Sequence, residues 1–381
     1  MKLHHLVTGR DKELEKIIIQ FDTVLQGHSA WTVIAGDIGI GKTALVKTAL
    51  ADLSSLNATC VYGKFEQYKN EEPYIPIIQI IEGITNHILT LPQEKLGQIS
   101  KNLKNQLGKD GTLLSEVVPQ IAKITGRHKK TRVPDYQKLK IRLAAAFQTF
   151  ITVAAKELYP LIIVVDDLQW ADRPSWDIIK AINDPLSEHD IYIILAYRNN
   201  LEEYRTRIKS ITDELAGNES ILEINLESLS YEAIEAMLGD IFNHHLENVS
   251  KLAQLLHRKT LGNPFYIKQI IKLFLDNKQL CYKSQKIWRL ESENLETLNF
   301  SSGMGDMINR KINSLNHQQK EFVETLACIG SKFSMELLGK IIKTENNLIA
   351  DNLQALCRAG LIVETFEHPR EGQPKEFEFF L

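Results

Sequence analysis

Apolar residues in the first 230 positions gather in short runs that alternate with longer amphipathic stretches. Runs rich in β-branched and aromatic residues predict five strands, at 31–35, 59–62, 161–165, 191–197 and 221–226. The run 161–165 is apolar at every position, which predicts a central strand buried on both faces. A long, mainly helical insert, roughly 75–155, separates the second strand from the third. This alternation is typical of a parallel α/β sheet covered by helices.

The hydrophobic spacing changes to three and four residues after Ser230. It predicts helices at 231–242, 249–258 and 265–276, with Gly262-Asn263-Pro264 as an interruption, then a β-hairpin formed by 279–283 and 286–290. Residues 305–365 supply three helical stretches, and a strand pattern follows at 376–381, which together suggest a winged-helix domain. We expect an α/β core at 1–229, a helical lid at 230–300 and a winged-helix-like domain at 301–381.

Composition excludes several classes of protein. Hydrophobic residues make up 44% and charged residues 24%, which are the values of a globular chain, and the net charge of −3 gives no broad attraction to nucleic acid or anionic lipid. The four cysteines lie far apart, so they predict neither a disulfide framework nor a zinc site. The longest apolar run, 191–197, is far shorter than the ~18 residues of a membrane span. Charged residues near the start exclude a signal-peptide core. A cytoplasmic protein without membrane contact is expected.

The first chemistry-bearing motif follows the first predicted strand. Residues 36–43, Gly-Asp-Ile-Gly-Ile-Gly-Lys-Thr, fit the phosphate-loop pattern G-x-x-x-x-G-K-[ST] (Walker A). Glycines let the backbone wrap around phosphates and aim N–H groups at their oxygens, and the next helix adds the positive end of its dipole. Lys42 is expected to reach the β- and γ-phosphates, and the Thr43 hydroxyl to bind Mg²⁺.

Two carboxylates end the third predicted strand. Asp166, at the tip of a central strand beside the phosphate loop, is expected to orient Mg²⁺, which is the Walker B role. Asp167 could polarise the attacking water as a general base, or cap the following loop. Arg198 ends the fourth strand, where it could sense the γ-phosphate or simply be solvated.

Missing motifs and local charge narrow the function further. No N-K-x-D motif appears, which favours ATP over GTP, and no protein-kinase motif set is present. The pairs His4-His5 and His244-His245 are interpreted as surface residues rather than metal ligands. The basic stretch 127–132 could touch nucleic acid or another acidic partner, but a solvated loop is favoured because no aromatic residues interleave with it. From Ser301 onward nine basic and eleven acidic residues give a net charge of −2, which disfavours DNA binding and favours protein contacts.

The motifs together resemble a known family. The block 166–172, Asp-Asp-Leu-Gln-Trp-Ala-Asp, and the segment 9–13, Gly-Arg-Asp-Lys-Glu, resemble the signal-transduction ATPases with numerous domains (STAND), a branch related to the AAA ATPases. The segments 63–67, 73–74, 196–200 and 259–265 narrow the resemblance to the ATPase module of large bacterial signalling proteins. In those chains the module typically sits between a serine/threonine kinase domain and GAF plus histidine-kinase domains. The family's chain continues beyond this point, so the present sequence is expected to be a fragment.

The resemblance implies an α/β fold of the P-loop NTPase type (ASCE/AAA-like), followed by a helical lid and a winged-helix domain. It implies Asp167, Lys42 and Arg198 as catalytic residues, with Arg198 as the sensor, and Thr43 and Asp166 as Mg²⁺ ligands. It implies that ATP or ADP is bound by Gly9, Arg10, Gly36, Gly39, Gly41, Lys42, Thr43, Ala44 and Pro264. Pro264 would pack on adenine from the lid, near the backbone of Gly9 and Arg10.

The favoured interpretation is an Mg²⁺-dependent switch that binds ATP, hydrolyses it slowly to ADP and phosphate, and regulates attached signalling domains or protein partners. Nucleotide-dependent self-association would fit such a switch. One alternative is an ATP-dependent transcription regulator that binds DNA through its winged helix. Another is the regulatory ATPase module of a kinase or nucleotide cyclase, whose catalytic residues would then lie outside this sequence.

Overall fold

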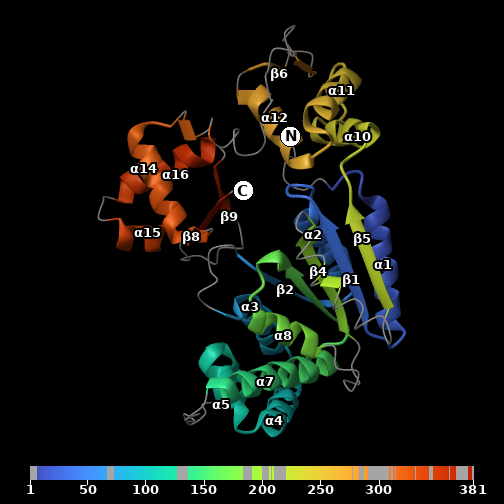
Figure 1. Ribbon diagram of the computed structural model, residues 1–381, viewed down its shortest axis with the longest axis vertical. Helices are drawn as coiled ribbons and strands as arrows, with labels where there is room; N and C mark the ends of the chain where they lie inside the picture. Colours follow the sequence, from blue (N-terminus) through green and yellow to red (C-terminus); the bar gives the residue numbers. More distant parts are fainter. Residues whose placement is uncertain are drawn as a thin grey trace. The chain divides into compact units, whose positions relative to one another are not determined.

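The chain folds into two compact units, residues 1–293 and 294–381. The computed structural model describes residues 7–66, 73–126, 136–182, 191–199, 206, 208–209, 220–276, 278–282, 287–290, 309, 312–313, 315–330, 332–342, 346–359, 361–365 and 376–379 (Figure 1). The basic stretch 127–132 and His4-His5 lie outside these residues.

A five-stranded parallel sheet forms the centre of the first unit. Its strands are β1 (Ala30–Gly36), β2 (Thr59–Lys64), β3 (Leu161–Asp166), β4 (Ile191–Arg198) and β5 (Ser220–Leu226). They lie in the order β2-β3-β4-β1-β5, and all four pairs are parallel. The five predicted strands are thus confirmed. β3 has a neighbour on each side, as its apolar run predicts, although β4 occupies the middle position.

Helices cover both faces of the sheet, because its strands bury side chains alternately to either side. One face packs against α1 (Asp11–Leu25) and α2 (Lys42–Ser55), with Ile34 of β1 and Phe21 of α1 in a shared core. The opposite face, with Trp31 of β1, packs against helices of the predicted insert. That insert consists of α3 (Ile75–Leu89), α4 (Gln93–Leu107), α5 (Asp110–Val117), the short η1 (Pro119–Ile121) and α6 (Ala122–Thr125), and α7 (Tyr136–Glu157). Two elements that follow β3, η2 (Leu168–Trp170) and α8 (Arg173–Ile182), pack into the same core.

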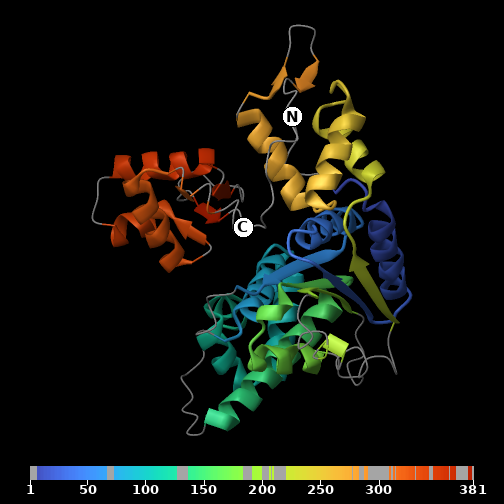
Figure 2. The ribbon, with the colours of Figure 1, turned by 45° about the horizontal axis from the view of Figure 1, so that its top comes forward.

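A small helical group follows the carboxyl end of β5. It comprises α10 (Tyr231–Ile241), α11 (Val249–Thr260), α12 (Pro264–Asp276) and an antiparallel pair, β6 (Leu280–Tyr282) with β7 (Trp288–Leu290) (Figures 1 and 2). The Ser230 hydroxyl caps α10 by accepting the Ala233 N–H, which ends the extended segment and starts the helix. Because the parallel strands end on this side, these helices stand beside the carboxyl edge of the sheet, where the motifs lie.

The described part of the second unit contains the helices α14, α15 and α16 and a small sheet. Its elements are α14 (His317–Ile329), β8 (Lys332–Ser334), α15 (Met335–Ile341), α16 (Asn346–Ala359), β9 (Ile362–Thr365) and β10 (Glu376–Phe379). The strands are antiparallel in the order β8-β10-β9, and Phe333 stacks on Phe377 within the core. The helical stretches and the last strand agree with the sequence pattern. β8 and β9 were not expected, because three or four residues carry too short an alternation to recognise.

Within the described residues, no helix is both long and apolar enough to cross a membrane, and no group of three or more His, Cys, Asp or Glu side chains could hold a metal.

One buried polar pair in the sheet gives a stability prediction. Tyr192 is fully buried, accepts a hydrogen bond from the Thr32 hydroxyl (2.7 Å) and donates one to the Ile17 carbonyl (3.0 Å). Tyr192→Phe leaves these groups without a partner in a dry core, so the free energy of unfolding should fall by about 1–2 kcal/mol. Urea denaturation followed by tryptophan fluorescence reports this unit alone, because all four tryptophans lie within residues 1–293.

The matched control is Tyr159→Phe. Its hydroxyl also donates to a backbone carbonyl, that of Val24, but the residue is 45% exposed. Water can replace that bond, so the loss should stay below about 0.5 kcal/mol. Equal losses in the two variants would contradict the assignment.

Candidate active site at the carboxyl edge of the sheet

The loop between β1 and α2 has the backbone that the glycine motif predicts. Gly39 and Gly41 have φ values of +75° and +103°, in the left-handed region where glycine is strongly favoured. A Cβ on Gly41 would have no heavy atom within 4 Å, whereas one on Gly39 would lie 2.7 Å from the Cβ of Phe265. The loop is therefore open beside Gly41 and closed by the helical group beside Gly39. Ala44 lies in the first turn of the helix that follows.

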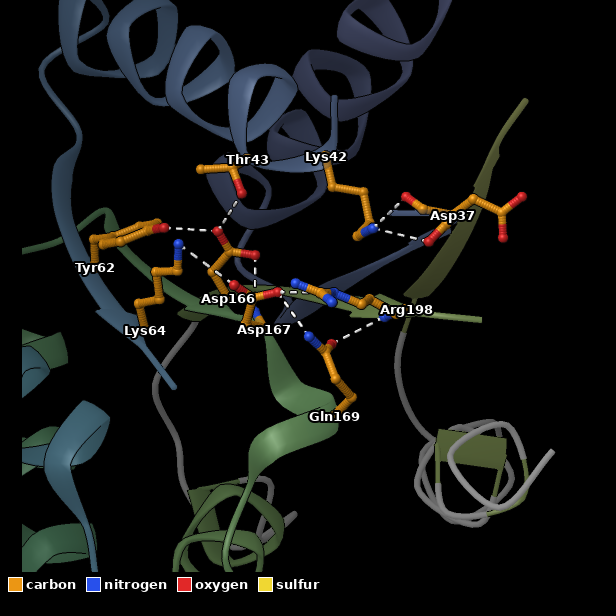
Figure 3. Close-up of polar contacts among 10 residues, drawn as sticks. Asp37, Lys42, Thr43, Tyr62, Lys64, Asp166, Asp167, Gln169 and Arg198 are labelled. Carbon is orange, nitrogen blue, oxygen red and sulfur yellow. Dashed lines mark hydrogen bonds and ion pairs between the residues drawn. The ribbon is translucent and has the colours of Figure 1, made fainter. Parts of the chain in front are cut away.

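Lys42 folds back into this loop. Its Nζ donates to the carbonyls of Gly36 (2.8 Å) and Asp37 (2.9 Å), and the residue is 7% exposed (Figure 3). Burial lowers the pKa of Lys42 from its ordinary value to about 8, although the nearby carboxylates, Asp167 first among them, oppose the shift. An approaching anion would stabilise the charged form, so this ammonium group is suited to a phosphate.

Asp166, at the end of β3, is fully buried and joins three elements. Its Oδ2 accepts from the Thr43 hydroxyl of α2 and from the Tyr62 hydroxyl of β2, both at 2.7 Å, and its Oδ1 accepts the Asp167 N–H at 2.8 Å (Figure 3). Thr43 and Asp166, the two residues predicted as Mg²⁺ ligands, are therefore in direct contact. Carboxylate and hydroxyl oxygens are the ligands that Mg²⁺ prefers.

Asp167 lies between two cations. Its Oδ2 is 3.4 Å from Lys64 Nζ, and its Oδ1 is 3.8 Å from Arg198 Nε (Figure 3). Oδ1 also accepts from Gln169 Nε2 at 2.7 Å, while Gln169 Oε1 accepts the Arg198 N–H at 3.0 Å. Asp167 has φ +54°, which is uncommon for a residue with a side chain and typical of functional sites. The structure thus brings Asp167 and Arg198 together.

The rest of the block 166–172 supports this geometry. The Trp170 ring lies 5.9 Å from the Arg198 guanidinium carbon, a cation–π arrangement. Asp172 caps α8, accepting from the N–H and the hydroxyl of Ser175 at 2.8 and 2.7 Å, and also accepts the Tyr74 N–H at 3.4 Å. Tyr74 precedes α3, so Asp172 links the insert to the loop that carries the carboxylates.

A turn from the helical group contacts the phosphate loop directly. We call residues 262–265 the GNPF turn. Asn263 Nδ2 donates to the Ile38 carbonyl at 3.0 Å, and the Phe265 N–H is 3.3 Å from the Gly39 carbonyl. Pro264 itself begins α12, where its missing N–H costs nothing. The turn therefore holds the loop through two of its backbone carbonyls.

Gly9 and Arg10 lie at the junction of the same elements. The buried Arg10 guanidinium donates through Nη2 to the carbonyls of Glu227 (2.6 Å) and Ile40 (3.2 Å). Gly9 has φ +81°, and a Cβ there would lie 2.6 Å from that of Ala233 in α10. The Arg10 side chain thus joins the phosphate loop to the segment that leads into the helical group.

Sequence reasoning missed Tyr62, Lys64 and Gln169. Tyr62 and Lys64 occupy alternate positions at the end of an edge strand, and only the strand order brings them to the carboxylates. Polar residues at the end of a predicted strand are a usable signal, because parallel strands end at one edge of the sheet. Gln169 lies inside the recognised block, but its role as a bridge depends on the approach of β4.

The comparisons with known proteins identify the family. A model of the AAA ATPase domain matches residues 6–196, half of the chain. The chain belongs to the AAA ATPase family. The match covers β1, β2, β3 and most of β4, the helical insert, the phosphate loop and the carboxylates that follow β3, and it ends before Arg198 and the GNPF turn. The AAA-related resemblance that the sequence motifs indicate is thus confirmed.

Two curated relatives and one solved structure are similar to this AAA ATPase. Hybrid signal transduction histidine kinase G of Dictyostelium discoideum is 22% identical over 94% of this chain and 12% of its own length. The peroxide stress-activated histidine kinase mak3 of Schizosaccharomyces pombe is 21% identical over 87% of this chain and 16% of its own length. The chain therefore spans less than a fifth of either relative. The STAND protein with a tetratricopeptide repeat sensor from Pyrococcus horikoshii is 16% identical and matches 99% of this chain and 42% of its own, with a TM-score of 0.46.

The close approach of the GNPF turn to the loop can be tested by adding one methyl group. Gly39→Ala should lower the free energy of unfolding by about 2–3 kcal/mol, because the residue has a positive φ and its Cβ would meet Phe265. Gly41→Ala shares the positive φ but has open space, so about 1 kcal/mol is expected. Denaturation without nucleotide separates these stability effects from any effect on binding.

Gly97→Ala is the control for the method. Gly97 lies inside α4 with open space around it, so alanine should stabilise the protein by about 0.5–1 kcal/mol. A Gly39 variant no less stable than the Gly41 variant would show that the GNPF turn does not pack on the loop.

Proposed function

We propose that this AAA ATPase is an Mg²⁺-dependent switch, which binds ATP, hydrolyses it slowly and regulates output domains attached to it or bound as partners. One observation carries the proposal. The phosphate loop, the Thr43–Asp166 pair and the Asp167–Arg198 pair converge at one edge of the sheet, and the GNPF turn is hydrogen-bonded to that loop. The proposed chemistry and the proposed lid therefore share the same backbone.

The residues present fit a nucleotide with its metal ion. The loop is open at Gly41, and the buried ammonium of Lys42 has only backbone carbonyls as hydrogen-bond acceptors within the described residues. Lys42 would leave these carbonyls and bind the phosphates. The loop N–H groups and the first turn of α2, at Ala44, would contact the phosphates as well. Thr43 and Asp166 would hold Mg²⁺, which when bound supplies charge neutralisation on the phosphate oxygens. The missing guanine-reading motif favours ATP over GTP.

Hydrolysis would depend on Asp167 and Arg198. Asp167 would accept the proton of the attacking water, and its constrained backbone and three side-chain neighbours hold the carboxylate in place. Arg198 lies at the edge of this cluster and would turn to the γ-phosphate, which only ATP carries. That contact supplies the difference in affinity between ATP and ADP that a switch requires.

The helical group is proposed to act as the lid. In this proposal Pro264 packs on adenine beside the backbone of Gly9 and Arg10, while Asn263 and Phe265 follow the phosphate loop. A change of loop conformation would reach the lid through these two hydrogen bonds and through the Arg10 guanidinium. A ligand shifts such an equilibrium only as far as its affinities for the two states differ.

The second unit is proposed to be a winged-helix domain that makes protein contacts. From α14 onward, its described elements follow the order helix, strand, helix, helix, strand, strand, with the last strand central in the sheet, which supports that fold. The acidic balance from Ser301 onward disfavours a DNA duplex. The two curated relatives are named as histidine kinases and are far longer than this chain, which supports a kinase as one output domain. Such a switch would act in the cytoplasm and could self-associate with nucleotide.

The first functional prediction concerns protons. Without ligand, the pKa of Lys42 is about 8 because the side chain is buried, and a bound phosphate raises it. ADP or ATP binding should therefore take up almost no proton at about pH 7, where Lys42 is already charged, and close to one proton at about pH 9. Calorimetry in buffers of different ionisation enthalpy measures this uptake. A pH-independent uptake would contradict the role of Lys42.

The second functional prediction separates binding from hydrolysis. Lys42→Ala should abolish ATP binding, because the phosphate charge loses its main counter-charge. Asp167→Asn keeps the shape but removes the base, so ATP should still bind while hydrolysis falls by ~10²-fold. In that ATP-retaining variant, hydrogen exchange in residues 255–270 should slow when ATP is added. Parental hydrolysis by the Asp167 variant, or protection confined to the phosphate loop, would contradict the proposed function.

A further inference from the structure

The short segment that follows β3 contacts Arg198 at three points. The Arg198 N–H donates to Gln169 Oε1 at 3.0 Å, and the side-chain Nε lies 3.8 Å from Asp167 Oδ1 (Figure 3). The guanidinium carbon lies 5.9 Å from the centre of the Trp170 ring, within the range of a cation–π contact. All three partners stand within four positions of the chain. We call this arrangement the resting position of Arg198.

The guanidinium is held in the resting position without hydrogen bonds of its own. Its separation of 3.8 Å from the Asp167 carboxylate makes an ion pair but is too long for a hydrogen bond. The Trp170 ring attracts the positive charge through its face. Within the part of the chain that the structure describes, the only hydrogen bond of Arg198 is that of its backbone N–H. The guanidinium N–H groups therefore remain available to an incoming anion.

Arg198 also stands beside the phosphate loop. In the parallel pair of β1 and β4, Arg198 lies directly opposite Gly36, the first residue of that loop. Neighbouring strands are ~4.8 Å apart, so a side chain as long as arginine can turn from the ring of Trp170 to a phosphate held by the loop. The proposed function requires this turn. The guanidinium thus has two competing positions, one on the ring and one on the γ-phosphate.

Trp170 is fixed and cannot follow the guanidinium. Its N–H donates to the Asp167 carbonyl at 3.0 Å, which closes the turn of η2. Its half-buried side chain packs against the core that α3 and α7 share with the sheet. An arginine that moves to a phosphate must therefore leave the ring behind.

We propose that Trp170 is a positioning residue that limits the preference of the site for ATP over ADP, by holding the Arg198 guanidinium in its resting position until a γ-phosphate displaces it. ATP must break the contact with the ring, whereas ADP leaves it intact because ADP has no γ-phosphate. The contact therefore lowers the affinity for ATP alone. The inference rests on the proposed role of Arg198 and adds the residue that opposes it.

The test compares the affinities of the full chain for two nucleotides, measured by calorimetry with Mg²⁺. The probes are ADP and an ATP analogue whose β,γ-imido bridge resists hydrolysis. Trp170→Leu keeps an apolar side chain but removes the ring face, so the Kd of the analogue should fall by about fivefold while that of ADP stays within about 1.5-fold. Trp170→Phe should lower the Kd of the analogue by only about twofold, because a phenyl face attracts a cation less strongly than indole does.

Trp176→Leu is the matched control. Trp176 is a second half-buried tryptophan against the same core, in α8, and takes no part in the resting position of Arg198. Its loss should leave the ratio of the two Kd values unchanged. A general loosening of the core would alter the binding of both nucleotides, and it would not strengthen the binding of the analogue alone.

A double-mutant cycle with Arg198→Ala identifies the residue through which Trp170 acts. In the Arg198→Ala background, Trp170→Leu should change neither Kd. The proposal is overturned if Trp170→Leu binds the analogue no more tightly than the parent does, if the affinity for ADP rises equally, or if the gain persists without Arg198. An Arg198→Ala variant with parental affinities for both nucleotides would instead show that the proposed role of Arg198 is wrong. Thermal unfolding and ADP binding check that each variant folds, and Trp170→Phe decides the question if the leucine variant does not.

Discussion

The site depends on one buried carboxylate, that of Asp166. A fully buried charge is costly unless hydrogen bonds replace the water it has lost. Asp166 accepts hydrogen bonds from Thr43, from Tyr62 and from the Asp167 N–H, so its partners come from α2, from β2 and from the backbone that follows β3. Satisfying this carboxylate therefore fixes the first turn of α2 and the end of β2 relative to β3. Those elements carry Lys42 and Lys64, so the same constraint places the ammonium group in the phosphate loop and the cation that faces Asp167.

A second constraint links the site to the helical group. The GNPF turn and Arg10 both bind the phosphate loop through its carbonyls, at Ile38, Gly39 and Ile40. In such a loop the N–H groups serve the ligand, so the carbonyl side remains available to the protein. Contacts of this kind depend on the conformation of the loop backbone and do not involve the ligand directly. In the proposed function, the helical group would respond to the phosphates through these contacts, and Pro264 would contact the base.

Much of the fold follows from local pattern. All five strands of the sheet, the helical insert, the helices α10, α11 and α12 and the antiparallel pair that follows them agree with the apolar spacing. Of the site, the phosphate loop and Asp166 were predictable because each motif requires a strand before it, and that strand is visible in the sequence. Arg198 was predicted as a strand-end residue, but its pairing with Asp167 required β4 to lie beside β3. β8 and β9 are too short to show an alternation of their own.

The sequence by itself determined which segments form the strands of the parallel sheet and where the phosphate-loop motif and the two carboxylates stand, because both depend on neighbours a few positions apart. Tertiary structure alone decided that β2 lies at the edge beside β3, which brings Tyr62 and Lys64 to residues more than 100 positions away. It also decided that Asn263 reaches the loop across 225 positions and Arg10 reaches Glu227 across 217. The physical reason is that strand order depends on the joint burial of both faces of the sheet, which no local pattern encodes.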